Sequence, residues 1–393
     1  MIDIEDYKIF KKILAVFSSE VLVLISRMVL ILYVANHMGV GSVGIYTTLM
    51  TWASIISLIS LFGGYNIIQK EGASDKIVSI VLFLSFFFSI ACSFFIVELL
   101  FTESRVAAFF IVISESLGLA IKSVTKSICY SKDQVRTLAK FNFYNSSVYI
   151  ISLCFLFYID EVDFFGLTIF VLVCNVFSIL LYGFCITKNV RVVKFRAIDC
   201  VNYITRSYTY LISSSLRNLF MQIDKVIINL AFGNTMSGVY NLCSRFVTTA
   251  VLPSNIYVQT IESKFYHSNG KSFELLKKAR VNVMKIAVSL SLLSVPFVLT
   301  ISNYLTGLDG VSEAYLYFIP LAVSMNLAYA YLSYLNAENN RLRIVYLVSL
   351  ITILCFSVFI VWLFFPSDFV FVPLVSSFFI CLSLVFINAK IRK

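Results

Sequence analysis

The feature that most constrains this chain is a series of long apolar runs separated by short polar segments. A bilayer core about 30 Å thick requires about 20 apolar residues per spanning helix. Only 13% of the residues are charged, against roughly 25% in a soluble domain, so the chain lacks the polar surface that water requires. The sequence therefore predicts an all-α integral membrane protein with twelve spans, at 13–35, 45–68, 77–97, 106–128, 141–159, 165–187, 207–231, 239–262, 283–302, 314–336, 344–364 and 369–389.

The basic residues between these runs indicate an orientation. If the twelve spans alternate in direction, nearly all loop lysines and arginines fall on the side of the N-terminus. The opposite side receives one basic residue, Arg105, and a group of acids: Glu98, Glu103, Asp160, Glu161, Asp163, Asp309, Glu313 and Asp368. By the positive-inside rule, both termini are predicted to be cytoplasmic. The net charge of +10 is therefore explained by topology, and we expect no nucleic-acid partner.

A short motif occurs twice. Gly39-x4-Gly44-Ile-Tyr46 follows the first apolar run, and Gly233-x4-Gly238-Val-Tyr240 follows the seventh, at an offset of 194. Because the two copies follow equivalent helices, duplication explains them better than chance. An even number of helices per half gives parallel repeats. We expect two six-helix lobes, residues 1–196 and 197–393, around a central cavity.

Cysteine and histidine give no sign of a metal or redox centre. The cysteines form no CxxC or Cys/His cluster, and most lie inside apolar runs, where cysteine behaves as a small hydrophobe. We expect no metal site, disulfide or cofactor.

Charges within the apolar runs are the candidate functional residues, because a charge near the bilayer centre costs roughly 2.5–3.5 kcal/mol. The predicted cations are Arg27, Lys122, Arg217, Lys225 and Arg245, and the acids are Glu20, Glu115 and Asp224. Lys126, nearer a helix end, is interpreted as snorkelling to the interface.

The spacing of these charges suggests partners on other helices. Glu20 and Arg27, Glu115 and Lys122, and Arg217 and Asp224 are each seven residues apart, on one helix face but about 10.5 Å along the axis. One interpretation is a set of interhelical ion pairs that hold the bundle together. The other is a net cationic cavity for an anionic cargo such as a phosphate, which arginine binds bidentately. The acids would then orient the arginines or carry a coupling proton or sodium ion.

Two segments resemble a known family. RMVLILYVANHMGVGSVGIYTTLMTWASIISL, which begins at Arg27, and QIDKVIINLAFGNTMSGVYNLCSRF, which contains Asp224, are similar to the Wzx-type flippases. These export lipid-linked O-antigen or capsule units and belong to the MATE-like multidrug/oligosaccharidyl-lipid/polysaccharide superfamily.

The resemblance implies a function. It implies alternating access in the bacterial inner membrane, with an undecaprenyl-diphosphate-linked glycan as cargo and a role in O-antigen or lipopolysaccharide biosynthesis. Membrane lipids, the polysaccharide polymerase and the chain-length machinery are the implied partners.

Two other functions are compatible with a chain of this length and hydropathy. A polymerase or ligase would display a large periplasmic loop with catalytic Arg or His, which this sequence lacks, so we expect no enzyme. A drug or metabolite antiporter on the same fold is the second alternative. Multidrug exporters often have a proline-kinked first helix, and this one has no proline.

Overall fold

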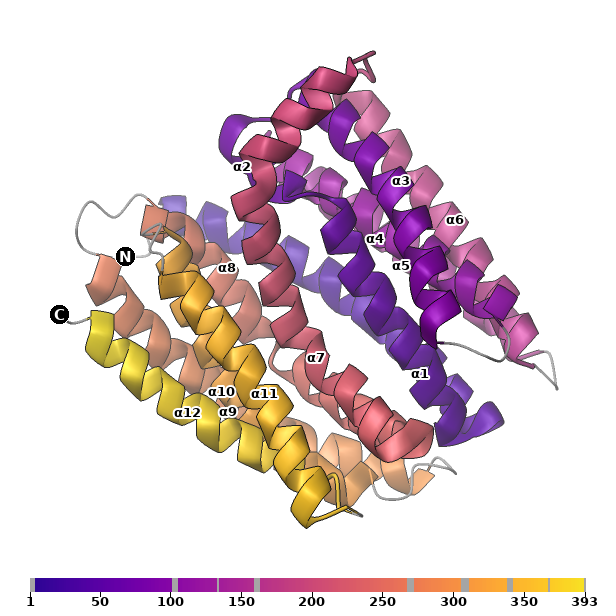
Figure 1. Ribbon diagram of the computed structural model, residues 1–393, viewed down its shortest axis with the longest axis vertical. Coiled ribbons are helices and arrows are strands. Elements are labelled where there is room, and N and C mark those ends of the chain that lie inside the picture. Colours follow the sequence, from indigo (N-terminus) through magenta and orange to yellow (C-terminus); the bar gives the residue numbers. More distant parts are fainter. Residues whose placement is uncertain are drawn as a thin grey trace. The chain divides into compact units, whose positions relative to one another are not determined.

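The computed structural model describes residues 4–100, 105–132, 134–158, 163–266, 272–304, 311–337, 342–366 and 368–391 (Figure 1). In these ranges the chain forms helices and turns, without a strand. The helices are α1 Ile4–Ser60, α2 Gly64–Glu71, α3 Asp75–Leu100, α4 Arg105–Ser131, α5 Val135–Leu156, α6 Phe164–Asn189, α7 Ala197–Ala250, α8 Leu252–Tyr266, α9 Ser272–Tyr304, α10 Val311–Ala337, α11 Leu342–Phe364 and α12 Phe371–Ile391.

Two glycines divide the longest helices. Gly39 in α1 has φ 81°, ψ 164°, and Gly233 in α7 has φ 80°, ψ 178°. Residues with a Cβ avoid this region, and glycine enters it at no steric cost. With α1 and α7 divided there, and with α2 and α8 continuing the second halves, the helices correspond to the twelve predicted spans. The predicted boundary between the spans 141–159 and 165–187 is confirmed at the start of α6, which is capped by Asp163; its side chain accepts a hydrogen bond from the Gly166 amide at 2.7 Å.

The surface and interior of the helices fit a lipid environment. In the described chain, eight helices are long and apolar enough to cross a membrane: α1 from Ser18, α3, α4, α6, α9, α10, α11 and α12. Large apolar side chains face outward, such as Phe95 and Phe155, which are 63% and 70% exposed. Small hydroxyl residues lie inside, and Ser89 donates to Ser60 at 3.2 Å. Small polar residues at helix contacts are typical of membrane bundles.

The packing repeats between the two halves of the sequence. Helix α4 packs against α2, α3, α5 and α6, while α10 packs against α8, α9, α11 and α12. Each of these helices is the fourth span of its half. The same relation between neighbours therefore occurs twice, as expected of a parallel pseudo-repeat.

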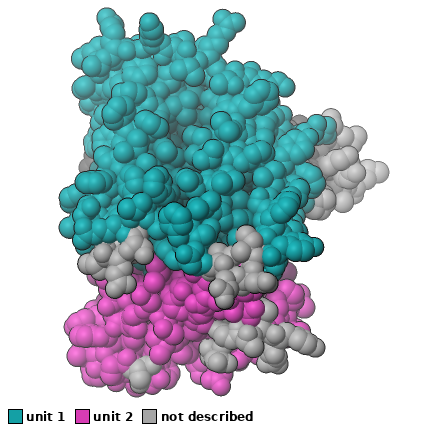
Figure 2. All heavy atoms as spheres, turned by 90° about the vertical axis from the view of Figure 1, so that its right-hand side faces the viewer, with its two compact units in different colours: residues 1–30, 48–218 teal, residues 31–47, 219–393 magenta. Residues whose placement is uncertain are grey.

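The chain divides into two compact units (Figure 2). Unit 1 contains residues 1–30 and 48–218, and unit 2 contains residues 31–47 and 219–393. The units are defined by which residues pack together and not by the sequence repeat. The end of the first span therefore belongs to unit 2, and the first part of α7 belongs to unit 1. The division into lobes at residue 196 follows the repeat and stays a prediction.

Within unit 1, polar contacts attach the start of α7 to α2 and α3. Arg206 pairs with Glu71 at 2.9 Å, and Lys76 pairs with Asp199 at 3.0 Å. The Val193 amide donates to Ser79 at 3.0 Å. These contacts explain why α7 begins in the same unit as the first helices.

Within unit 2, the two glycine motifs pack against each other. A Cβ added to Gly44 would overlap the carbonyl oxygen of Asn234, and one added to Gly238 would overlap the carbonyl oxygen of Val40. Gly44 and Gly238, like Val40 and Asn234, are related by the offset of 194. The contact is therefore reciprocal: each glycine motif, called a glycine turn from here on, places its second glycine against the backbone of the other.

Candidate functional site: membrane charge clusters

In unit 1, charged residues of α1 and α4 form a cluster. Arg27 Nη1 lies 2.7 Å from Glu115 Oε1, and Lys126 Nζ lies 2.8 Å from Glu20 Oε1. The Glu115 side chain is only 1% exposed. Both pairs join different helices, as the seven-residue spacing predicted, so interhelical ion pairing accounts for these four residues.

The interpretation of Lys126 as a snorkelling side chain was wrong. Its ammonium group donates to Glu20 and its side chain is 19% exposed. Glu20 comes from a segment 106 residues earlier, so no local pattern indicates the pair. Coulomb attraction within a poorly hydrated bundle exceeds the gain from extending toward the interface.

Lys122 distinguishes this cluster from a purely structural network. It lies on α4 between Glu115 and Lys126, half-buried, and interacts electrostatically with both ion pairs. It forms no hydrogen bond or ion pair with any residue that the structure describes. With Arg27 and Lys126 against Glu20 and Glu115, Lys122 leaves the cluster with a surplus positive charge.

A neutral network that sequence reasoning missed supports these helices. Asn142 donates to Ser19 at 3.3 Å and accepts from Tyr182 at 2.7 Å, while Asn175 donates to Ser114 at 3.2 Å. Asparagines inside apolar runs are unusual, because an unpaired amide in hydrocarbon is costly, and that signal could have identified them. The bonds hold α1, α4, α5 and α6 in register around the charges.

In unit 2, Asp224 is the buried acid. It is 3% exposed, and Tyr240 donates to its Oδ2 at 2.7 Å. Its Oδ1 is buried and accepts no hydrogen bond from the described residues. Neighbouring Lys225 instead donates to Gln222 at 2.8 Å. Within the described chain, Asp224 has no cation at ion-pair distance.

The structure distributes the predicted site residues over both units. Arg27, Lys122, Arg217, Glu20 and Glu115 belong to unit 1, whereas Asp224, Lys225 and Arg245 belong to unit 2. Lys225 and Arg245 are close enough to interact electrostatically. That all five cations line one cavity stays a prediction.

Comparison with known proteins identifies the architecture. No family model and no curated protein matches the sequence. Among solved structures, an inward-facing multidrug-resistance MATE-family transporter of the MOP superfamily has a TM-score of 0.70 and 14% identity, covering 95% of this chain and 96% of its own.

Two further structures show the same architecture. The lipid II flippase MurJ, in an inward closed conformation, has a TM-score of 0.67 and 14% identity, covering 98% of this chain and 88% of its own. An outward-facing MATE transporter has a TM-score of 0.62 at 14% identity, covering 98% and 97%. The chain has the MATE-like fold. The similarity extends over nearly the whole chain, and at this identity it establishes the fold alone.

Proposed function

We propose that this chain is a flippase. By alternating access it moves undecaprenyl-diphosphate-linked O-antigen or polysaccharide units from the cytoplasmic to the periplasmic leaflet of a bacterial inner membrane. The observation that carries the proposal is the surplus cation Lys122, held between two ion pairs. An unpaired ammonium group in a membrane bundle is costly, and an anionic cargo would remove that cost.

The charge of the cluster favours this cargo over the alternative. MATE multidrug transporters share the fold, so a drug antiporter is the second candidate. A cationic drug would meet like charge at Lys122, whereas a diphosphate would meet opposite charge. MurJ, a lipid II flippase, has the same fold, which supports transport of a lipid-linked glycan on such a scaffold.

Asp224 is the acid best suited to bind a coupling ion. Glu20 and Glu115 each have a cation at ion-pair distance, whereas Asp224 has none in the described chain and its Oδ1 is buried without a hydrogen-bond donor. A proton or sodium ion could bind there. In proteoliposomes, transport driven by an imposed proton or sodium gradient should be lost in Asp224→Asn, and transport by the unchanged protein that ignores both gradients would refute the coupling.

Replacing Lys122 tests the cargo. In cells that depend on this gene for surface polysaccharide, Lys122→Gln should abolish the polymer while the protein still inserts. Lys140→Gln removes the same charge from an exposed position and should have no effect. Arg217→Ala is expected to behave like Lys122→Gln. Normal polysaccharide in both site variants would defeat the proposal, and protection against toxic cations that is lost in Lys122→Gln would favour the antiporter.

A further inference from the structure

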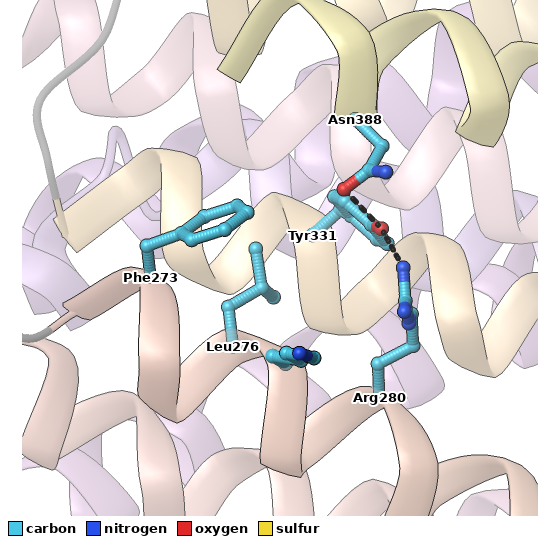
Figure 3. Close-up of a pocket in the computed structure, with 6 residues that line it drawn as sticks. Phe273, Leu276, Arg280, Tyr331 and Asn388 are labelled. Carbon is cyan, nitrogen blue, oxygen red and sulfur yellow. Dashed lines mark hydrogen bonds between the residues drawn. The ribbon is translucent and has the colours of Figure 1, made fainter. Parts of the chain in front are cut away.

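The ends of α9, α10 and α12 that are predicted to be cytoplasmic enclose a small cleft in unit 2 (Figure 3). Arg280 lies near the start of α9, Tyr331 near the end of α10 and Asn388 near the end of α12. The cleft is lined by Phe273, Leu276, Lys277, Arg280, Tyr331 and Asn388.

The polar groups in the cleft offer donors and few acceptors. Arg280 Nη1 donates to the Tyr331 hydroxyl at 3.3 Å, and this hydroxyl donates to Asn388 Oδ1 at 3.2 Å. Figure 3 shows the three side chains in this chain of contacts. The guanidinium has five N–H groups and the Asn388 amide has two. Those that remain, and the Lys277 ammonium group, donate to no other residue in the described ranges.

The residues around the cleft also carry a net positive charge, which favours an anionic ligand as the surplus of donors does. Lys277, Lys278 and Arg280 lie within the first turns of α9, and Glu274 is the acid of that stretch. Glu274 is exposed and forms no ion pair with a described residue. Arg280 likewise has no carboxylate partner in the described chain. Among the described residues, the cleft therefore holds an arginine with unused donors and no counterion.

Apolar residues lie next to these donors. Leu276 is 2% exposed, and Phe273 is half-buried beside it. Val258, Val283, Tyr329 and Ala330 form a buried cluster that joins α8, α9 and α10, so the frame of the cleft is fixed by packing. A ligand here would meet cations and an apolar wall within one helical turn.

We propose that this cleft binds the phosphate of an anionic lipid at the headgroup level of the cytoplasmic leaflet. A phosphate presents only acceptors, and an arginine fork binds it with two parallel hydrogen bonds. The space inside is about 10 Å³, enough for one oxygen-sized group. One phosphate oxygen enters, the headgroup stays outside, and the acyl or prenyl chain follows Phe273 into the bilayer. The site does not depend on the proposed cargo.

Lipid binding to the purified full-length chain tests this proposal. Native mass spectrometry would count phosphatidylglycerol and phosphatidylcholine bound to the unchanged protein and to Arg280→Gln, Lys277→Gln and Lys278→Gln. Lys278 is exposed and does not line the cleft, so its variant is the matched charge control. Tyr331→Phe removes the hydroxyl that positions Arg280 and provides a second variant if Arg280→Gln does not fold.

The expected result is preferential binding of phosphatidylglycerol, weakened about tenfold or more in Arg280→Gln, because a charge-assisted hydrogen bond is lost. Lys277→Gln and Tyr331→Phe should weaken it less, and Lys278→Gln by less than about twofold. Undecaprenyl phosphate is then added as a competitor: displacement of phosphatidylglycerol shows that the site accepts either lipid phosphate, and no displacement shows that it prefers the phospholipid, so both results support the site. Competition by inorganic phosphate alone, equal binding of phosphatidylcholine, or equal loss in Lys278→Gln would overturn it.

Discussion

The reciprocal contact of the two glycine turns predicts that one added methyl group will change the conformational equilibrium. A Cβ at Gly44 would overlap the carbonyl oxygen of Asn234 and lie 2.8 Å from its carbonyl carbon. A Cβ at Gly238 would overlap the carbonyl oxygen of Val40 and lie 3.1 Å from its carbonyl carbon. Both obstacles are backbone atoms, which cannot rotate away as a side chain would.

Overpacking of this kind costs about 1–3 kcal/mol. The cost applies only to conformational states in which the turns touch. Because the turns lie on the predicted outer side, these are the states closed to the periplasm. A difference of about 1–3 kcal/mol between two states shifts their populations about 5- to 150-fold. Gly44→Ala and Gly238→Ala should therefore each favour the state in which the outer turns are apart.

Pulsed electron–electron spin resonance can measure this shift. Spin labels at Asn36 and Met236, both exposed, would report the separation of the turns after replacement of the nine native cysteines. Either alanine variant should move the distance distribution outward and slow transport. Gly183→Ala, where an added Cβ meets nothing within 4 Å, should change neither. An unchanged distribution in both Gly44→Ala and Gly238→Ala would refute the reasoning.

Three further outcomes are expected. Tyr240→Phe removes the donor to Asp224 and should destabilise the protein by about 1–3 kcal/mol, measured by thermal unfolding. Tyr317→Phe, where the hydroxyl has no hydrogen-bond partner in the described chain, should not; equal melting points would contradict this. Arg27→Met should lower the melting temperature more than Arg27→Met combined with Glu115→Leu, because the single change leaves Glu115 buried without its cation; an additive loss would contradict it. The pKa of Asp199 is lowered, first by the Arg196 backbone amide and then by Lys76, so its stabilisation is present above its ordinary pKa and lost as the pH falls through the lowered one. Hydrogen exchange in residues 190–206 should therefore rise below about pH 4, and Asp199→Asn should show the raised exchange without the pH dependence.

Local patterns predicted much of the fold. Apolar run length placed the spans, because each spanning helix must satisfy its own backbone hydrogen bonds in lipid. The start of α6 also matches the predicted span, since Asp163 is a good helix cap. The glycine motif predicted a duplicated arrangement, and Gly39 and Gly233 adopt the same positive φ.

The partners of the charged residues were not predictable in the same way. The seven-residue spacing showed that the partners must come from other helices, but not which ones. The ion pair of Lys126 was not predicted because its partner Glu20 is 106 residues away. Lys122 could not be recognised as a cation without an ion-pair partner in the described chain until both pairs were known. The link between Asp224 and Tyr240 joins the two sides of the Gly233 break and also depends on tertiary geometry.

From the amino-acid sequence alone it follows that the chain spans a membrane as a helical bundle built from two similar halves. Those properties depend on hydropathy, length and motif spacing along the chain. Only helix packing shows which charges neutralise each other, that Lys122 has no ion-pair partner in the described chain, and that the two glycine turns touch through their backbones. Residues far apart in the sequence meet only when helices pack, and the free energy of a buried charge depends on the groups that then surround it.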